Sequence, residues 1–162
     1  MIVYHGGTDI VRTPRILQAF TGRDFGTGFY TTDIRDQAIK WAKRQARYRR
    51  KDEAILNTYE LSDSARHLLK TKSFDGYAMD WLDFVVENRS NPNFSHSFDI
   101  VIGNIANDNV GETVSYVVQG IITKEIALER LKFEKINNQV CFNTINSLKY
   151  LKYIGHTESW ED

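Results

Sequence analysis

Short apolar and alternating segments recur along the chain and predict strands. Such segments occupy residues 1–5 (MIVYH), 54–61 (AILNTYEL), 70–74 (KTKSF), 98–106 (FDIVIGNIA) and 138–144 (NQVCFNT). Their length and their β-branched and aromatic content are typical of half-buried or buried strands. Residues 148–155 (LKYLKYIG) fit either a strand or the end of a helix.

A period of 3.6 residues predicts helices between these segments. The longest candidate is 32–50, with Thr32 or Asp33 as its N-cap and a stripe formed by Ile34, Ala38, Trp41, Ala42 and Ala46. Further helices are predicted over 77–89, 110–120 and 123–131, and Gly120 ends the second of these three.

The order of these elements predicts an α+β fold. Helices and strands do not alternate regularly, and the strands are too short and scattered for a doubly wound parallel sheet. Only two prolines occur, with no repeat and no low-complexity stretch to mark a linker. We therefore expect a single domain over residues 1–162.

Composition narrows the classes of partner only slightly. Lysine plus arginine and aspartate plus glutamate number 21 each, so the net charge favours neither nucleic acid nor acidic lipid. One cysteine, Cys141, excludes an internal disulfide, and no long apolar run predicts a membrane segment. These two features lead us to expect a cytoplasmic protein without a membrane partner. His67, His96 and His156 lack metal-ligand spacing among themselves and with Cys141, so we expect no metal.

Two glycine-bearing segments carry the candidate chemistry. Residues 25–33 (FGTGFYTTD) form either a strand-to-helix turn or the floor of a ligand site, because Gly26 and Gly28 permit close approach to the main chain. This segment lacks the last glycine of a dinucleotide fingerprint and the lysine of a phosphate-binding loop. Residues 3–8 (VYHGGT) place His5 at a strand end beside accessible backbone, either as a ligand contact or as a packed structural residue.

Together the two segments resemble the histidine–tyrosine–glutamate class of ADP-ribosyltransferases, which includes diphtheria toxin and the poly(ADP-ribose) polymerases. YHGGTDI and, about twenty residues later, DFGTGFYTTDIRDQAIKWA match its first two motifs. The whole chain is also similar to a small bacterial family of unknown function in that superfamily, often encoded as a toxin beside an antitoxin. Three further patterns carry that similarity: W-x-x-F-V-x-x-N-R at 81–89, D-I-V-x-G-x-I-A-x-D at 99–108 and N-Q-x-C-F at 138–142.

The resemblance implies a split, mainly antiparallel β-sandwich with flanking helices, and it assigns roles to single residues. His5 would bind the adenosine-side ribose of NAD, and the backbone of Gly6 would hold the nicotinamide amide. Tyr30 would stack on the nicotinamide ring, with Trp41, eleven residues later, closing the sandwich. The implied NAD-binding set is His5, Gly6, Gly7, Arg23, Phe25, Gly28, Tyr30, Trp41 and Arg89.

The third motif departs from the usual pattern, since Gln139 stands where the class has a glutamate. An amide offers a dipole where a carboxylate gives a full charge, so stabilisation of the transition state would be weaker. A carboxylate from elsewhere is then needed, and Asp108 is favoured over Glu134 because it follows a strand end. The alternative for Asp108 is an N-cap of the following helix. The implied catalytic set is Gln139, Tyr30, His5 and Asp108.

For other polar residues the sequence leaves two alternative roles open. Arg89 either binds a diphosphate or pairs with a helix-end carbonyl or an acid, and Arg23 either reaches a phosphate or is solvated. Asp24 is expected to order its loop. The basic run 43–51 is either a solvated helix face or the resting place of a nucleic-acid or acidic protein target.

The function expected from the resemblance is NAD-dependent mono-ADP-ribosyl transfer to an intracellular macromolecule, protein or nucleic acid, by the toxin of a bacterial toxin–antitoxin pair. NAD would be the substrate and a cognate antitoxin the protein partner. The alternatives are an NAD glycohydrolase or other nucleotide-using enzyme on the same fold, and an inactive module that binds NAD, a nucleotide or a protein.

Overall fold

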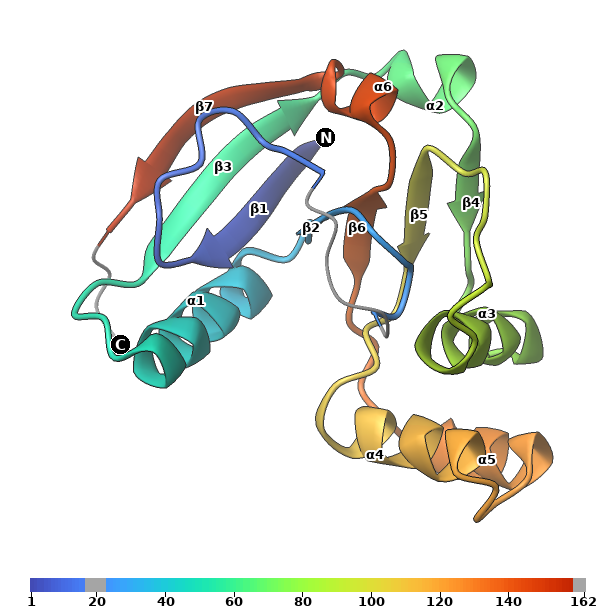
Figure 1. The fold of residues 1–162 in the computed structure, drawn as a ribbon. Coiled ribbons are helices and arrows are strands. Elements are labelled where there is room, and N and C mark those ends of the chain that lie inside the picture. Colours follow the sequence, from blue (N-terminus) through green and yellow to red (C-terminus); the bar gives the residue numbers. More distant parts are fainter. Residues whose placement is uncertain (17–22, 159–162) are drawn as a thin grey trace.

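The computed structural model describes residues 1–16 and 23–158, and within them helices and two sheets form an α+β fold, as predicted. Figure 1 shows the sheets side by side, with α1 under the first sheet and α3, α4 and α5 below the second. Four of the five strand pairings are antiparallel.

The first sheet has the order β1 (Ile2–Gly7), β3 (Ile55–Leu61), β7 (Leu151–Thr157). Helix α1 (Arg35–Arg49) packs on it through a stripe of alanines, Ala38, Ala42 and Ala46. The approach is close, because a Cβ atom on Gly6 would lie 2.1 Å from the carbonyl oxygen of Ala38. Small residues on both elements therefore allow helix and strand to meet at backbone distance.

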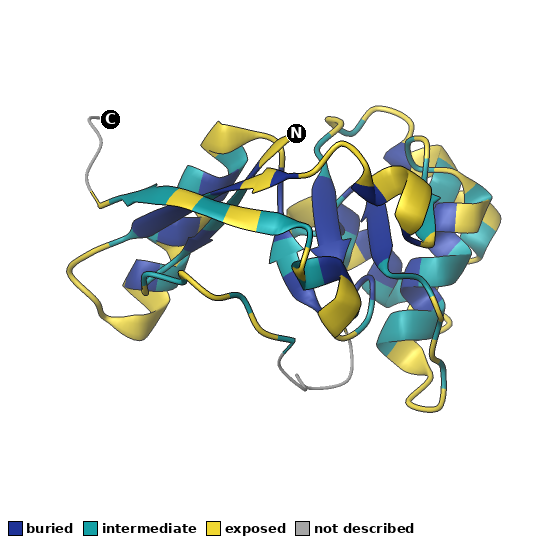
Figure 2. Ribbon diagram, turned by 90° about the horizontal axis from the view of Figure 1, so that it is seen from above, coloured by how far each residue is buried: buried dark blue, intermediate teal, exposed yellow. Residues whose placement is uncertain are grey.

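The second sheet has the order β2 (Phe29–Thr31), β6 (Gln139–Phe142), β5 (Ile100–Gly103), β4 (Thr71–Ser73). Strands β5 and β6 are buried along their whole length and are dark in Figure 2. One apolar cluster lies between this sheet and the helices α3 (Met79–Ser90), α4 (Asp108–Val118) and α5 (Lys124–Leu131). A second cluster joins the other face to Val3, Tyr59 and Leu61 of the first sheet.

The two sheets meet where β1 passes β2. Tyr4 and Thr32 form an isolated bridge, with N–O distances of 2.7 and 2.9 Å in the two directions. Each sheet thus brings one predicted motif to this junction: VYHGGT on β1 and FGTGFYTTD before and along β2.

Several local predictions were wrong. Helix α1 starts at Arg35 after Ile34, and neither Thr32 nor Asp33 is its N-cap. The Thr32 hydroxyl accepts from the amide of Ile34 at 3.0 Å and donates to the carbonyl oxygen of Asn138, while Asp33 accepts from the side chain of Asn138. Trp41 and Ile34 are 45% and 39% exposed, so they flank the alanine stripe instead of belonging to the core. The short helices α2 (Ala65–Leu68) and α6 (Ile145–Leu148) were not predicted, and the ambiguous segment 148–155 ends α6 and enters β7.

Across the described ranges, we find no helix that combines the length and the apolar character needed to cross a bilayer.

Candidate functional site

His5 links the two sheets at their junction. Its Nδ1 lies 2.8 Å from the carbonyl oxygen of Tyr30, and its ring lies 4.6 Å from the ring of Phe29, centroid to centroid. Because a carbonyl oxygen only accepts, Nδ1 carries the hydrogen. Burial is the main cause that lowers the pKa of His5, and the positive charges of Arg23 and Arg49 lower it further. At neutral pH the ring is therefore an uncharged tautomer with a lone pair on Nε2.

Gly7 borders the Nε2 atom of His5. A Cβ atom at position 7 would lie 3.6 Å from Nε2, and among the described residues other than its chain neighbours only the His5 ring comes within 4 Å of that Cβ position. No described residue hydrogen-bonds Nε2. The site thus offers one acceptor, beside a glycine, to a donor such as a sugar hydroxyl.

Gly6 has a different environment from the one that the resemblance implies for a nicotinamide contact. Its backbone pairs with Leu56 across β3, and its Cα faces α1 so closely that any side chain would strike Ala38 and Ala42. The glycine at position 6 is explained by this packing alone.

Two hydrogen bonds fix the hydroxyl of Tyr30. Its hydroxyl donates to the carbonyl oxygen of Gly26 at 2.5 Å and accepts from the amide of Phe25 at 3.1 Å. Burial, more than any nearby charge, raises the pKa of this phenol well above its ordinary value. The guanidinium of Arg23 lies 5.0 Å from the ring centroid. One face of the ring that the resemblance gives to nicotinamide is therefore covered by an exposed arginine.

The loop before β2 is fixed by neighbours on every side. His96 Nε2 and Asn143 Nδ2 both donate to the carbonyl oxygen of Phe25, at 2.8 and 2.9 Å. Gly26 has a φ of 83°, which favours glycine, and a Cβ on Gly28 would lie 2.6 Å from the carbonyl oxygen of Phe142. Segment 25–28 is thus a tight turn that packs on β6, and the Phe25 side chain is buried in the core, where it cannot contact a ligand.

Arg89 pairs with an acid and a carbonyl, the structural alternative to a diphosphate contact. Its Nε donates to Asp24 at 2.6 Å, and its terminal nitrogen donates to the carbonyl oxygen of Ala106 at 2.6 Å. Asp24 also accepts from the amide of Ala106 at 2.9 Å. The side chains of Arg89 and Asp24 are 22% and 10% exposed. This buried triangle joins the loop before β2 to the loop that follows β5, and Asp24 orders its loop as expected.

Gln139 lies on the same sheet face as Tyr30. Tyr30 pairs with Cys141, and Gln139 is two residues from Cys141 on β6, so all three side chains project to one face. Gln139 is 6% exposed, and its Nε2 has no hydrogen-bond partner among the described residues. A buried amide without a hydrogen-bond partner is energetically unfavourable, so this Nε2 is suited to donate a hydrogen bond to an acceptor atom of a ligand.

Asn138 fixes the start of β6, a role that the sequence did not reveal. Its carbonyl oxygen accepts from Thr32 Oγ1 at 2.8 Å and from Gln37 Nε2 at 2.7 Å, and its own side chain donates to Asp33 at 2.9 Å. The hydroxyl and acid that looked like a helix cap therefore hold the residue before Gln139.

Asp108 is the first residue of α4 and has a φ of 49°, unusual for a residue other than glycine. Its N-cap alternative was wrong, because Asn107 holds that place without a side-chain bond. The carboxylate is exposed and lies 3.4 Å from Arg44 of α1, whose guanidinium is 6.0 Å from the ring of Trp41. Trp41, Arg44 and Asp108 thus form a second small group of side chains, which connects α1 to α4.

Glu134 and Cys141 are the two remaining sequence candidates, and Cys141 lies beside Tyr30 on the same sheet face as Gln139. Glu134 lies near Tyr77. Burial is the main cause that raises the pKa of the Tyr77 phenol to about 12, and the negative charge of Glu134 is the second cause. Cys141 is fully buried, and burial raises the pKa of its thiol to about 12, which fits a structural thiol.

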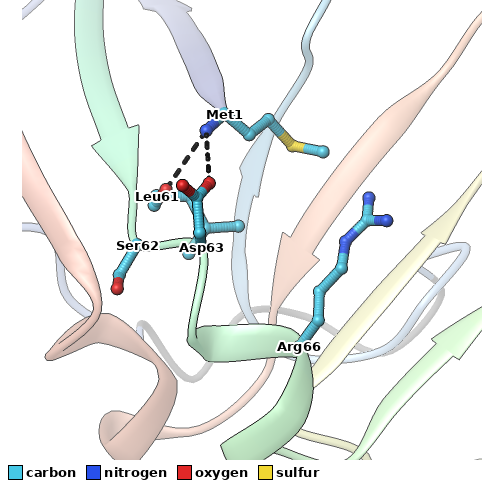
Figure 3. Close-up of a pocket in the computed structure, with 5 residues that line it drawn as sticks. All are labelled: Met1, Leu61, Ser62, Asp63 and Arg66. Atoms are coloured by element: carbon cyan, nitrogen blue, oxygen red, sulfur yellow. Dashed lines mark hydrogen bonds and ion pairs between the residues drawn. The ribbon is translucent and has the colours of Figure 1, made fainter.

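A separate pocket lies at the other end of β1, lined by Met1, Leu61, Ser62, Asp63 and Arg66 (Figure 3). From Ile2 to Gly7 the strand spans roughly 16 Å, so this pocket does not belong to the His5 site. Among residues 1–16 and 23–158, no group of three or more His, Cys, Asp or Glu side chains is arranged to hold a metal ion.

A family model described as "Protein of unknown function (DUF3990)" matches residues 1–153. No curated protein and no solved structure matches the chain.

Proposed function

The chain belongs to the DUF3990 family of proteins of unknown function, and we propose that it is an NAD-dependent mono-ADP-ribosyltransferase, the toxin of a bacterial toxin–antitoxin pair that acts in the cytoplasm. The observation that supports the proposal most is the bond from His5 Nδ1 to the Tyr30 carbonyl oxygen. It joins the two motifs that resemble this enzyme class and leaves Nε2 with a lone pair. The implied ribose contact requires that acceptor.

The proposed reaction breaks the N-glycosidic bond between nicotinamide and its ribose. The bonding pair leaves with nicotinamide, the ribose carbon gains oxocarbenium character, and a nucleophile of the acceptor forms the new bond while its proton passes to water or a base. His5 Nε2 would accept from a ribose hydroxyl of NAD. Gln139 would orient the nicotinamide ribose through its amide, and its unpaired Nε2 would donate to a ligand oxygen.

Binding without chemistry is a second candidate, and two observations favour it. Gln139 supplies no negative charge near the reacting carbon, and Asp108 is exposed and paired with Arg44. The Arg23 guanidinium over Tyr30 would also have to move before a nicotinamide ring could stack on that face. NAD hydrolysis with water as the acceptor is a third outcome of the same test.

The test measures nicotinamide release and incorporation of labelled ADP-ribose into a bacterial lysate, beside a calorimetric titration that measures NAD binding. We expect both for the parent protein, loss of both for His5→Ala, and faster nicotinamide release for Gln139→Glu, which restores the carboxylate of the class. Circular dichroism confirms that each variant is folded. NAD binding with neither release nor incorporation would support the inactive module, and release without incorporation would support the hydrolase. No binding of NAD at all would overturn the proposal.

A further inference from the structure

The outer face of α1 concentrates positive charge on a chain that is neutral overall. Eight of the 21 lysine and arginine residues lie between positions 35 and 51, against one acidic residue there, Asp36. With 3.6 residues per turn, the side chains opposite the buried alanines gather on one side of the helix. They include Lys40, Trp41, Arg44, Arg47 and Tyr48, with Lys51 just past the C-terminus, and we call these six residues the α1 ridge. The acid Asp36 lies on the same side, one turn before Lys40.

Most cations of the α1 ridge are not neutralised by the protein itself. Within the described ranges, Lys40, Arg47 and Lys51 have no acidic partner, while Arg44 contacts Asp108 at the ridge's edge. The first sheet covers the opposite face of the helix, so the ridge points to solvent (Figure 1). A set of exposed like charges repels itself and is stabilised by a polyanion.

Aromatic rings are interleaved with these charges. Tyr48 is 85% exposed and Trp41 is 45% exposed, although the opposite face of the same helix buries only alanines. The two rings are seven residues apart, about 10 Å along the helix axis, and lie on the same side. Exposed rings between lysine and arginine side chains suit unstacked bases attached to phosphates, because every base has a face that can stack on a ring.

We propose that the α1 ridge binds single-stranded DNA, with bases on Tyr48 and Trp41 and phosphates on Lys40, Arg47 and Lys51. A duplex would hide its base faces from both rings. RNA gains little over DNA here, because Tyr48 is the one side chain of the ridge that can accept the proton of a 2′-hydroxyl.

Binding of single-stranded DNA to the ridge does not depend on the proposed enzyme activity. The role of the bound strand does depend on it. Trp41 and Arg44 lie at the end of the ridge that faces Asp108. A DNA strand on the ridge would therefore reach the contact between Arg44 of α1 and Asp108 of α4. If the protein transfers ADP-ribose, the strand on the ridge is the acceptor. This last step rests on the proposed function.

Fluorescence anisotropy with a labelled dodecamer of thymidine, in the absence of NAD, tests the ridge alone. We expect Tyr48→Ala to weaken binding about tenfold through loss of one stacked base. Lys40→Glu combined with Arg47→Glu should weaken it further and flatten the slope of log affinity against log salt by at least about 1.4, at roughly 0.7 per lost phosphate contact. Arg66→Glu, on exposed α2, is the matched control and should change affinity little.

Each arm has a result that would overturn the proposal. Equal losses of DNA affinity for Arg66→Glu and for the double variant would mean that positive charge anywhere on the protein attracts the DNA, without a specific site on the ridge. Binding of poly-glutamate as tight as that of the DNA, with no effect of Tyr48→Ala, would assign the ridge to an acidic protein. Tighter binding of the uridine dodecamer or of a duplex would refute the choice of single-stranded DNA. Because NAD is absent, failure of the enzyme proposal leaves these results unaffected.

Discussion

Replacement of Arg89 by alanine separates a structural role for this residue from a role in binding a diphosphate. In the structure its guanidinium bonds Asp24 and the carbonyl oxygen of Ala106, both at 2.6 Å. Alanine would leave the carboxylate of Asp24, 10% exposed, with the Ala106 amide as its one remaining hydrogen-bond partner among the described residues. We therefore expect the main effect of Arg89→Ala on stability.

The magnitude follows from the burial of the pair. Removal of one partner of a buried ion pair costs about 3–5 kcal/mol, because the other charge is left uncompensated. For a protein of this size each kcal/mol lowers the melting temperature by about 2–4 °C, so a fall of roughly 6–20 °C is expected. Arg89→Lys keeps the charge but not both bonds, and should fall between the parent and Arg89→Ala.

Differential scanning calorimetry measures this shift, with Arg66→Ala as an exposed-arginine control expected within about 0.5 kcal/mol of the parent. Asp24→Asn combined with Arg89→Ala should recover part of the loss, since the uncompensated charge is then gone. A melting temperature for Arg89→Ala equal to that of the parent, together with weaker NAD binding, would refute this reasoning and restore the diphosphate role.

Three further predictions concern the junction. Gly6→Ala should lower the free energy of unfolding by at least about 1–3 kcal/mol in a urea titration, since its Cβ would lie 2.1 Å from the Ala38 carbonyl oxygen; an unchanged midpoint would contradict the close packing. The His5 pKa is lowered on folding, so its share of stability is complete above about pH 6.5 and is lost as the pH falls below that value; His5→Gln should lack this part of the acid dependence. Burial raises the pKa of Cys141 to about 12, so a disulfide reagent at pH 8 should label it only in denaturant, and rapid labelling of the native protein would disprove its burial.

The sequence predicted the elements better than the contacts between them. Apolar spacing located three strands of the second sheet, β4, β5 and β6, and the long helices, because burial of one face leaves a visible period. Strand β2 was not predicted, because its three residues are too few to show such a period. Trp41 shows the limit of that method. It has the right spacing for the apolar stripe, but Gly6 draws α1 so close to β1 that only alanine fits between them, and the larger ring is displaced to the side.

The candidate site was predictable in part. The motif residues His5 and Tyr30 do meet, through a side-chain-to-backbone bond that bridges the two sheets. The bonds of Thr32 and Asp33 to Asn138 were not predictable, because a hydroxyl and an acid before a helix look the same whether they cap it or bind a distant residue. Arg23 over Tyr30 was equally hidden, since one sequence carries no sign of which arginine covers a ring.

The central claim is that His5 Nε2, kept accessible by Gly7, accepts from a ribose hydroxyl of NAD. Calorimetric titration of NAD into Gly7→Val tests it most directly, because a branched side chain there would cover Nε2 and leave the Nδ1 bond to Tyr30 in place. Gly155→Val is the matched control, since open space surrounds that position on β7. We expect binding by the parent and by Gly155→Val, and at least about tenfold weaker binding, about 1.4 kcal/mol, by Gly7→Val at an unchanged melting temperature. Equal affinity of all three proteins for NAD, or no binding by the parent, would contradict it.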